Sequence, residues 1–301
     1  QSESVENYMS FKYSIDQALK VCPNPDLMIS AGDTTQNGYK STEWEACFEV
    51  MHDYYAKYPT VTVAGNHEMK GDWNFISFAQ RFNMSGAKTG YPEFDRTMGY
   101  FEYGDAIFVI LNGEVTPADK KPEIMKKELQ WCKSVLDASD KKWRIVMTHA
   151  GPYTSNHDPL DVRDYYINDS EYSLDAMGVD LFLNGHDHIY IRSTVKNDIK
   201  VNTGDGTTYI TGGTVGNKFY EYMPARSNYS TDFYVDEEDK QVFSVIEFSE
   251  DSIKGTADQK QDVDNWNSFK AVDSYEIRNT LREGKSVTDY TDVPANAWYY
   301  K

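Results

Sequence analysis

Two histidines, His186 and His188, follow an apolar run at residues 179–183 that breaks at Gly185. Neutral imidazole is the commonest side-chain metal ligand, so the pair can offer both rings to one ion or to two adjacent ions. A pair of loop histidines that binds no metal is the alternative. The other apolar runs of the chain must decide between these two interpretations.

Three further apolar runs also end in polar residues. Short runs of Val, Ile, Leu and Met without clear alternation are typical of strands buried on both faces. Open α/β sheets bind ligands at the C-terminal edge of their strands, where one carboxylate, one amide and three imidazoles are expected to meet. This mixed oxygen and nitrogen set suits Zn, Fe, Mn or Co, and the sequence therefore predicts a metal site. The three runs are residues 26–31 before Asp33, 60–64 before Asn66, and 143–148 before His149.

The order of these motifs resembles that of the calcineurin-like metallophosphoesterases, and most closely that of the purple acid phosphatase branch. The resemblance covers roughly residues 1–280 and implies an α/β fold, a four-layer αββα sandwich of two mixed sheets. The motifs are Gly32-Asp33, Gly65-Asn66-His67-Glu68, Val146-Met147-Thr148-His149 and Gly185-His186-Asp187-His188, with support from Arg81-Phe82-Asn83-Met84, Gly99-Tyr100-Phe101-Glu102-Tyr103-Gly104 and His149-Ala150-Gly151-Pro152-Tyr153.

The resemblance implies two adjacent metal ions as cofactors. Asp33 is the expected bridge between them, because it is the only carboxylate at one of these strand ends and a carboxylate has two oxygens and a full charge. By the resemblance, Asn66, His149 and His186 complete the shell of one ion. His188 belongs with Asp33 to the other ion.

By the same resemblance, His67 lies over the leaving-group oxygen, which it stabilises or protonates. His67 and Asp33 are therefore the predicted catalytic residues, and a structural role behind the ligands is the alternative for His67. Asn66, His67 and His157 are the predicted substrate contacts, and His157 occupies a long polar loop. Glu68 either orients His67 or supports its loop.

Two positions depart from the family pattern. The family's first Asp-bearing strand does not precede the helix expected at residues 6–20, so we expect the natural chain to carry it immediately before Gln1. The tyrosine ligand of the purple branch is replaced by Gln36, a weak oxygen ligand or none, so no iron-tyrosinate colour is expected. With only Asp33 and His188, the second ion should bind more weakly than the first, because catalytic zinc sites usually have three protein ligands.

The composition limits the partners. The 301 residues carry a net charge of −18, which argues against nucleic acid as a partner. A small phosphorylated substrate is compatible with this charge, because bound metal cations invert the local potential. The chain has no apolar run long enough to span a membrane. The cysteines are expected to be buried small hydrophobes, or to form one disulfide, and they are Cys22, Cys47 and Cys132.

Strands interleaved with helices, followed by strands alone, predict two sheets packed face to face with helices outside. A strand pair is expected around Gly104-Asp105, and residues 151–172 form a long connection. His52 is expected to be a surface or packing residue of its helix and not a ligand. Helices are expected at residues 6–20, 41–55, 72–84 and 123–136, and later strands at 189–195, 208–211, 241–248, 252–257 and 271–278.

We interpret residues 1–280 as a catalytic domain and residues 281–301 as a linker and the start of an S-layer-homology-like segment. Tyr290–Lys301 carries that likeness, with a disordered aromatic tail as the alternative. The segment predicts a secreted or cell-wall-associated bacterial protein that binds a wall polymer.

The predicted function is metal-dependent hydrolysis of phosphate esters. A pyrophosphatase or nucleotidase on the same scaffold is one alternative, and a surface binding module with a decayed metal site is another.

Overall fold

The computed structural model describes residues 2–82, 84, 87–114, 121–157, 160–167, 169, 171–223, 233–235 and 240–278. The S-layer-like segment at residues 281–301 lies outside the described residues. Its identity, its wall polymer and the division of the chain into two parts therefore stay predictions.

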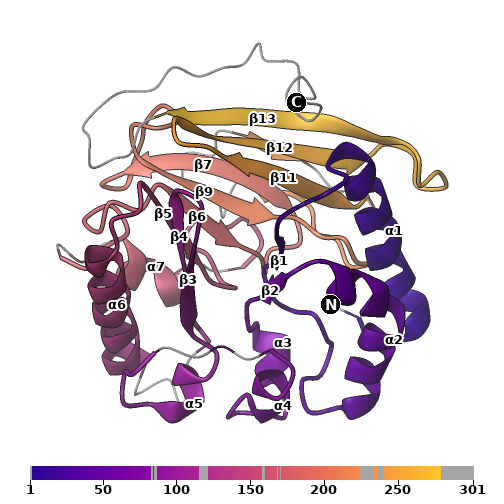
Figure 1. The fold of residues 1–301 in the computed structure, drawn as a ribbon, viewed down its shortest axis with the longest axis horizontal. Coiled ribbons are helices and arrows are strands. Elements are labelled where there is room, and N and C mark those ends of the chain that lie inside the picture. The colour runs from indigo at the N-terminus through magenta and orange to yellow at the C-terminus, as the bar shows by residue number, and fades with distance from the viewer. Residues whose placement is uncertain are drawn as a thin grey trace.

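A large mixed sheet forms the centre of the fold (Figure 1). Its strands are β3 (Gly99–Tyr103), β4 (Ala106–Ile110), β5 (Trp143–Met147), β6 (Leu181–Asn184), β7 (Tyr190–Lys196), β8 (Ile199–Lys200), β9 (Thr207–Gly212) and β10 (Phe233–Val235). The spatial order is β10-β7-β9-β6-β5-β4-β3, with β8 beside β7. Strands β4, β5, β6 and β9 run parallel, so their C-terminal ends share one edge.

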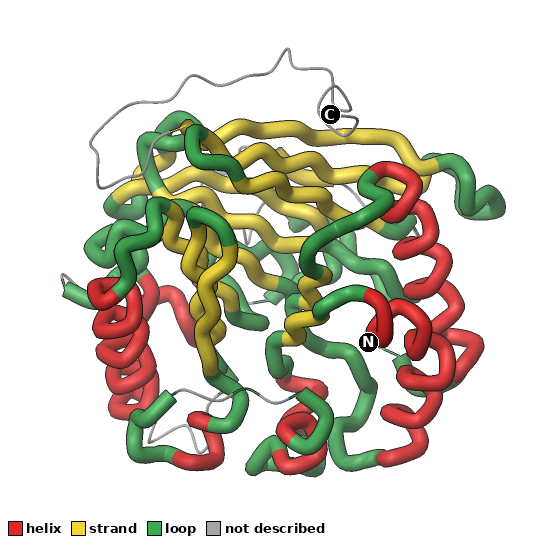
Figure 2. The backbone as a smooth tube through the Cα atoms, in the orientation of Figure 1, coloured by secondary structure: helices red, strands yellow, loops and turns green. Residues whose placement is uncertain are grey.

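Two smaller sheets accompany it. The strands β11 (Val242–Phe248), β12 (Ser252–Lys260) and β13 (Phe269–Arg278) form an antiparallel sheet over one face of the large sheet. The strands β1 (Met28–Ser30) and β2 (Thr60–Thr62) form a separate parallel pair. Helices lie outside these sheets (Figure 2). The predicted α/β sandwich is confirmed, although the described residues form an antiparallel sheet and a separate parallel pair in place of a second mixed sheet.

The central strands β4, β5 and β6 of the large sheet are buried on both faces, as their apolar runs predict. On β4, Ile107 and Val109 pack into the helix-side core with Ile124 of the neighbouring helix. Phe108 and Ile110 point the other way and pack with residues of the three-stranded sheet. Burial of each such side chain contributes roughly 1.5–3 kcal/mol. The central strands lack polar alternation because both faces are covered.

The helices are α1 (Val5–Val21), α2 (Ser41–Lys57), α3 (Asn66–Met69), α4 (Ile76–Ala79), α5 (Pro92–Asp95), α6 (Lys121–Ala138) and α7 (Leu160–Tyr166). Helices α1 and α2 pack against each other through Tyr8, Ile15 and Met51. The expectations for α1, α2 and α6 are confirmed. Helix α7, within the long connection, and the short strands β8 and β10 were not predicted.

The prediction of a helix over residues 72–84 is wrong. The backbone of Phe75 has a φ of 52°, in the left-handed region, so only the short helix α4 follows it. The Asp72 carboxylate accepts the backbone N–H of Ser77 at 2.6 Å and stabilises this late start. Phe75 and Phe78 are nevertheless buried in the core, which is why their spacing resembled a helix face.

The structure also tests the expectations for the cysteines and for His52. Cys22, Cys47 and Cys132 are free thiols, and the last two are buried, so the disulfide alternative is wrong. His52 lies exposed beside Asp53, as expected. Among the described helices, none combines the length and the apolar character that a membrane crossing requires.

Glu128 on α6 predicts how stability changes with pH. Burial raises the pKa of its carboxyl from 4.5 to about 8, against the opposing effect of the Asn112 backbone N–H. The folded protein holds this proton while the unfolded chain releases it, so stability falls as pH rises from 4.5 to 8. Glu128→Gln should raise the Tm at pH 8 and change it little at pH 5. One kcal/mol corresponds to roughly 2–4 °C in domains of this size.

Thermal unfolding at both pH values checks this prediction. Glu123→Gln is the matched control, because Glu123 lies on the exposed side of the same helix. Equal Tm changes at pH 5 and pH 8 for the Glu128 variant would contradict the argument.

Candidate metal centre

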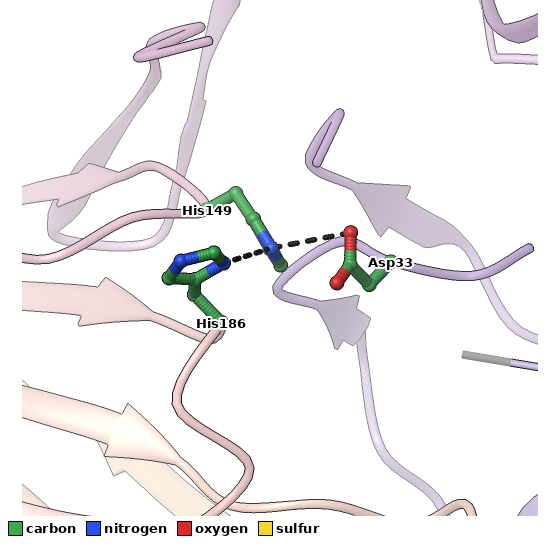
Figure 3. Close-up of side chains that lie close together, drawn as sticks. All are labelled: Asp33, His149 and His186. Carbon is green, nitrogen blue, oxygen red and sulfur yellow. Dashed lines mark hydrogen bonds and ion pairs between the residues drawn. The ribbon is translucent and has the colours of Figure 1, made fainter. Parts of the chain in front are cut away.

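Asp33, His149 and His186 come together at the centre of the site (Figure 3). One ligand atom from each lies within 4.8 Å of the others. His149 stands between its neighbours, with Nε2 3.2 Å from Asp33 Oδ1 and 3.2 Å from His186 Nδ1. These atoms belong to the segments that follow β1, β5 and β6.

Asn66 adds a fourth donor from the segment after β2. Its Oδ1 lies 3.2 Å from His149 Nε2 and 3.2 Å from His186 Nδ1. The ring of His149 donates Nδ1–H to the carbonyl of Ala31 at 2.7 Å, because a carbonyl can only accept. In its neutral form, His149 therefore presents the Nε2 lone pair to the other donors, as a metal ligand must. The four residues fit one ion with oxygen and nitrogen ligands.

Glycine permits the close approach of these segments. A Cβ on Gly32 would lie 2.6 Å from His149 Nδ1, and a Cβ on Gly65 would lie 2.4 Å from Asp33 Oδ1. The backbone of Gly32 has a φ of 97°, which glycine adopts without steric cost. Asp33 itself has a φ of 55°, an uncommon conformation that clusters at functional sites.

Glu68 holds this strained segment in place. Its buried carboxylate accepts the backbone N–H groups of Asp33 at 2.9 Å, Thr35 at 3.0 Å and Gly65 at 2.8 Å. Glu68 thus ties the segment after β1 to the segment after β2. These hydrogen bonds favour loop support over the alternative that Glu68 orients His67.

The charged groups of the site change one another's pKa values. Burial alone would raise the pKa of Asp33, but His149 and His67 hold it well below its usual range. Burial lowers the pKa of His149, but Asp33 outweighs this effect and raises it to about 9. Burial, followed by the charge of His149, lowers the pKa of His186 to about 3. His186 is therefore neutral and able to bind a metal, whereas His149 must exchange its proton for one.

His67 lies beside this cluster without belonging to it. Its backbone N–H donates to Asp33 Oδ1 at 3.0 Å, and its ring Nε2 lies 4.0 Å from Asp33 Oδ2. The ring donates Nδ1–H to the backbone carbonyl of Gln36 at 2.8 Å. Gln36 thereby contributes a main-chain group, and its role as a weak side-chain ligand stays a prediction.

His188 leaves β6 with His186 but turns toward a different segment. Its Nδ1 donates to the carbonyl of Lys218 at 2.9 Å, and its ring stacks on Tyr220 with centroids 4.7 Å apart. The group of donors found among the described residues does not include His188. Its assignment to the second ion stays a prediction.

His157 approaches the cluster from the loop after β5. Its ring centroid lies 3.8 Å from that of His186, and its Nδ1 lies 2.8 Å from Asp187 Oδ1. Sequence reasoning missed two residues here. Asp187 lies between the two histidines of the motif after β6, and nothing else in the sequence marks it as functional. Tyr220 is marked only by its place in a loop after a strand.

The comparisons with known proteins agree with this geometry. Residues 8–190 match the calcineurin-like phosphoesterase family, and this match covers more than half of the chain. The chain therefore belongs to the calcineurin-like phosphoesterase family. All four motif segments, from Asp33 to His188, lie within the match.

Three individual relatives have low sequence identity to this chain. Purple acid phosphatase 18 of Arabidopsis thaliana is 28% identical over 200 residues, which are 62% of this chain and 43% of that protein. The chain thus spans less than half the length of this relative. Purple acid phosphatase PPD1 from yellow lupin seeds shares the fold with a TM-score of 0.66 at 15% identity, over 91% of this chain and 50% of that chain. GAP50, described as the anchor in the inner membrane complex of Plasmodium, shares it with a TM-score of 0.59 at 17% identity, over 91% and 83%.

The geometry predicts unequal metal sites. The first equivalent of Zn²⁺ or Mn²⁺ should bind at the cluster of Asp33, Asn66, His149 and His186, since its donors already converge. His149→Ala or His186→Ala should weaken that binding by more than roughly 100-fold, because even residues outside the ligand set matter by 10–100-fold. His188→Ala should retain the first equivalent.

Calorimetric titration and elemental analysis of dialysed protein check this prediction. His52→Ala is the control, since that ring is exposed on α2 and does not belong to the converging donors. Loss of the first equivalent in His188→Ala, together with full binding in His149→Ala, would refute the assignment.

Proposed function

We propose that this protein hydrolyses phosphate esters at a centre of two metal ions. The observation that carries this proposal is the convergence of Asp33, Asn66, His149 and His186 from four strand ends onto one point. Membership of the calcineurin-like phosphoesterase family supports it. The substrate is a small phosphorylated molecule, and the metals are Zn, Fe, Mn or Co.

Each ligand has a distinct task. Two adjacent ions supply a clamp on the phosphoryl group and a bound water of lowered pKa. Asp33 would contribute to holding both ions, Asn66, His149 and His186 would hold the first, and His188 would hold the second. The amide oxygen of Asn66 carries no charge, so it leaves the first ion more electrophilic than another carboxylate would. We expect Asn66 to contact the substrate as well, with its amide N–H donating to a phosphate oxygen.

His67 acts on the leaving group. The carbonyl of Gln36 accepts its Nδ1–H, which fixes the ring and leaves Nε2 on the side of Asp33. Burial lowers the pKa of His67, and the charge of Asp33 opposes this effect. In the imidazolium form both nitrogens carry protons, and Nε2 would donate to the leaving-group oxygen as a general acid. The proton thereby passes from His67 to the alcohol that departs.

The fold by itself does not decide the function, since GAP50 has a similar fold and is described as an anchor. The buried and converging donor atoms of this chain argue against a binding module with a decayed metal site. A pyrophosphatase or nucleotidase would use the same residues and differ only in the loops that surround the substrate.

Chelation tests the proposal. Hydrolysis of p-nitrophenyl phosphate should fall to background after exhaustive chelation, because the attacking water and the phosphate clamp both need the ions. Addition of Zn²⁺, Mn²⁺, Co²⁺ or iron should restore part of the rate. Pyrophosphate and a nucleoside monophosphate are assayed in parallel. Full activity in the chelated protein would eliminate the metal mechanism, and no activity on any ester with metal bound would favour the binding module.

Replacement of His67 separates catalysis from metal binding. His67→Ala should lower kcat by about 10²–10⁴-fold, the range for loss of a general acid, while the metal content stays unchanged. The rate of esters with acidic leaving groups should fall least, because they need no proton. A steady-state series of aryl phosphates with parallel metal analysis measures this. Metal loss in His67→Ala would identify the residue as a ligand.

A further inference from the structure

Asp187, between the two motif histidines, has an unusual set of partners. Its side chain is 0% exposed. One carboxylate oxygen accepts the backbone N–H groups of Ser155 and of Asn156, the latter at 2.8 Å. The other accepts the backbone N–H of His157 at 2.9 Å and the ring Nδ1–H of His157 at 2.8 Å. One buried carboxylate thus holds three successive residues of the neighbouring loop.

The same loop is fastened on its other side. The backbone N–H of Met223 donates to Ser155 Oγ at 2.6 Å, and the Asn156 side chain donates to the carbonyl of Glu221 at 2.7 Å. Tyr220 of that segment meets the His157 ring with centroids 5.4 Å apart. The loop that carries His157 is therefore held between the motif after β6 and the segment after β9.

These contacts determine how the His157 ring is presented. Asp187 can only accept from the ring, so the proton of neutral His157 resides on Nδ1, and Nε2 is the nitrogen that can meet a ligand. The ring lies against that of His186, and its side chain is 36% exposed. His157 therefore offers a fixed and partly exposed polar atom beside a predicted metal ligand.

We propose that Asp187 is a positioning residue that fixes the loop at 155–157 and turns His157 Nε2 toward the substrate phosphate. This inference rests on the proposed function. Asp187 does not touch the substrate and acts only through His157. A carboxylate is required because both of its oxygens accept, whereas the amide of asparagine would direct a donor at backbone N–H groups.

A double-mutant cycle tests this. His157→Ala and Asp187→Asn should each raise the KM for p-nitrophenyl phosphate about tenfold or more, the scale of one hydrogen bond to a charged oxygen. The double variant should show no further rise beyond His157→Ala, because Asp187 acts through the lost ring. Metal content should remain that of the wild type. Multiplied effects in the double variant would overturn the proposal.

Asp180→Asn is the matched control. Asp180 is also buried, and it accepts the backbone N–H of Arg144 at 2.9 Å. It lies immediately before β6, whereas Asp187 lies after the other end of that strand. Its loss should lower the Tm and leave the KM unchanged. A rise in KM equal to that of Asp187→Asn would show that any buried carboxylate of this strand has the same effect, and the proposal would fail.

A measurement without turnover separates this inference from the proposed function. In the metal-loaded wild type, proton NMR with ¹⁵N-labelled histidine should show a slowly exchanging Nδ1–H for His157, assigned by its absence in His157→Ala. If no ester is hydrolysed but this proton is present, the proposed function fails and the Asp187 contact survives. A His157 ring that is protonated on Nε2 alone, or whose Nδ1 proton exchanges freely with water, would overturn the inference. This test does not depend on whether Asp187→Asn folds.

Discussion

The imidazole of His149 connects the parallel pair of β1 and β2 to the large sheet, and the candidate metal centre depends on this connection. Its Nδ1 bonds to the carbonyl of Ala31 after β1, while its backbone belongs to the segment after β5. Its Nε2 faces Asp33. The two sheets must be seated against each other before the donors converge. Assembly of the ligand set is therefore part of tertiary folding, and a bound metal would stabilise the folded chain by binding only that state.

The sequence predicted the strands well because burial on both faces is visible in composition. On β4, Ile107 and Phe108 face opposite cores, so neighbouring positions are both apolar. The segment at residues 72–84 shows the limit of this reasoning. Phe75 and Phe78 both face the core, but the backbone between them begins in the left-handed region. Apolar spacing records which side chains are buried, and several backbone paths can bury the same side chains.

The same limit applies to the residues of the site. The residues that directly follow strands were predictable, because a strand direction determines where its end lies. Contacts that depend on loop conformation were not, since nothing local in the sequence specifies them. The bond between His157 and Asp187 spans 30 positions of the chain, and the ring of His188 meets Tyr220 from a segment after β9. Both arise only when loops from different strands pack against one another.

Glu68 and Asp187 show how an acidic chain uses its carboxylates at this site. Each adjoins a motif histidine, and each accepts backbone N–H groups from a neighbouring segment. Burial raises the pKa of Glu68, and the charge of Asp33 adds to this effect, because the two carboxyl groups lie close together in a space with little water. Protonated His149 offsets part of it. A divalent cation offsets more, because it brings two positive charges and converts the same imidazole into a neutral ligand. The carboxylates that hold the segments in place would therefore also favour a cation at the centre.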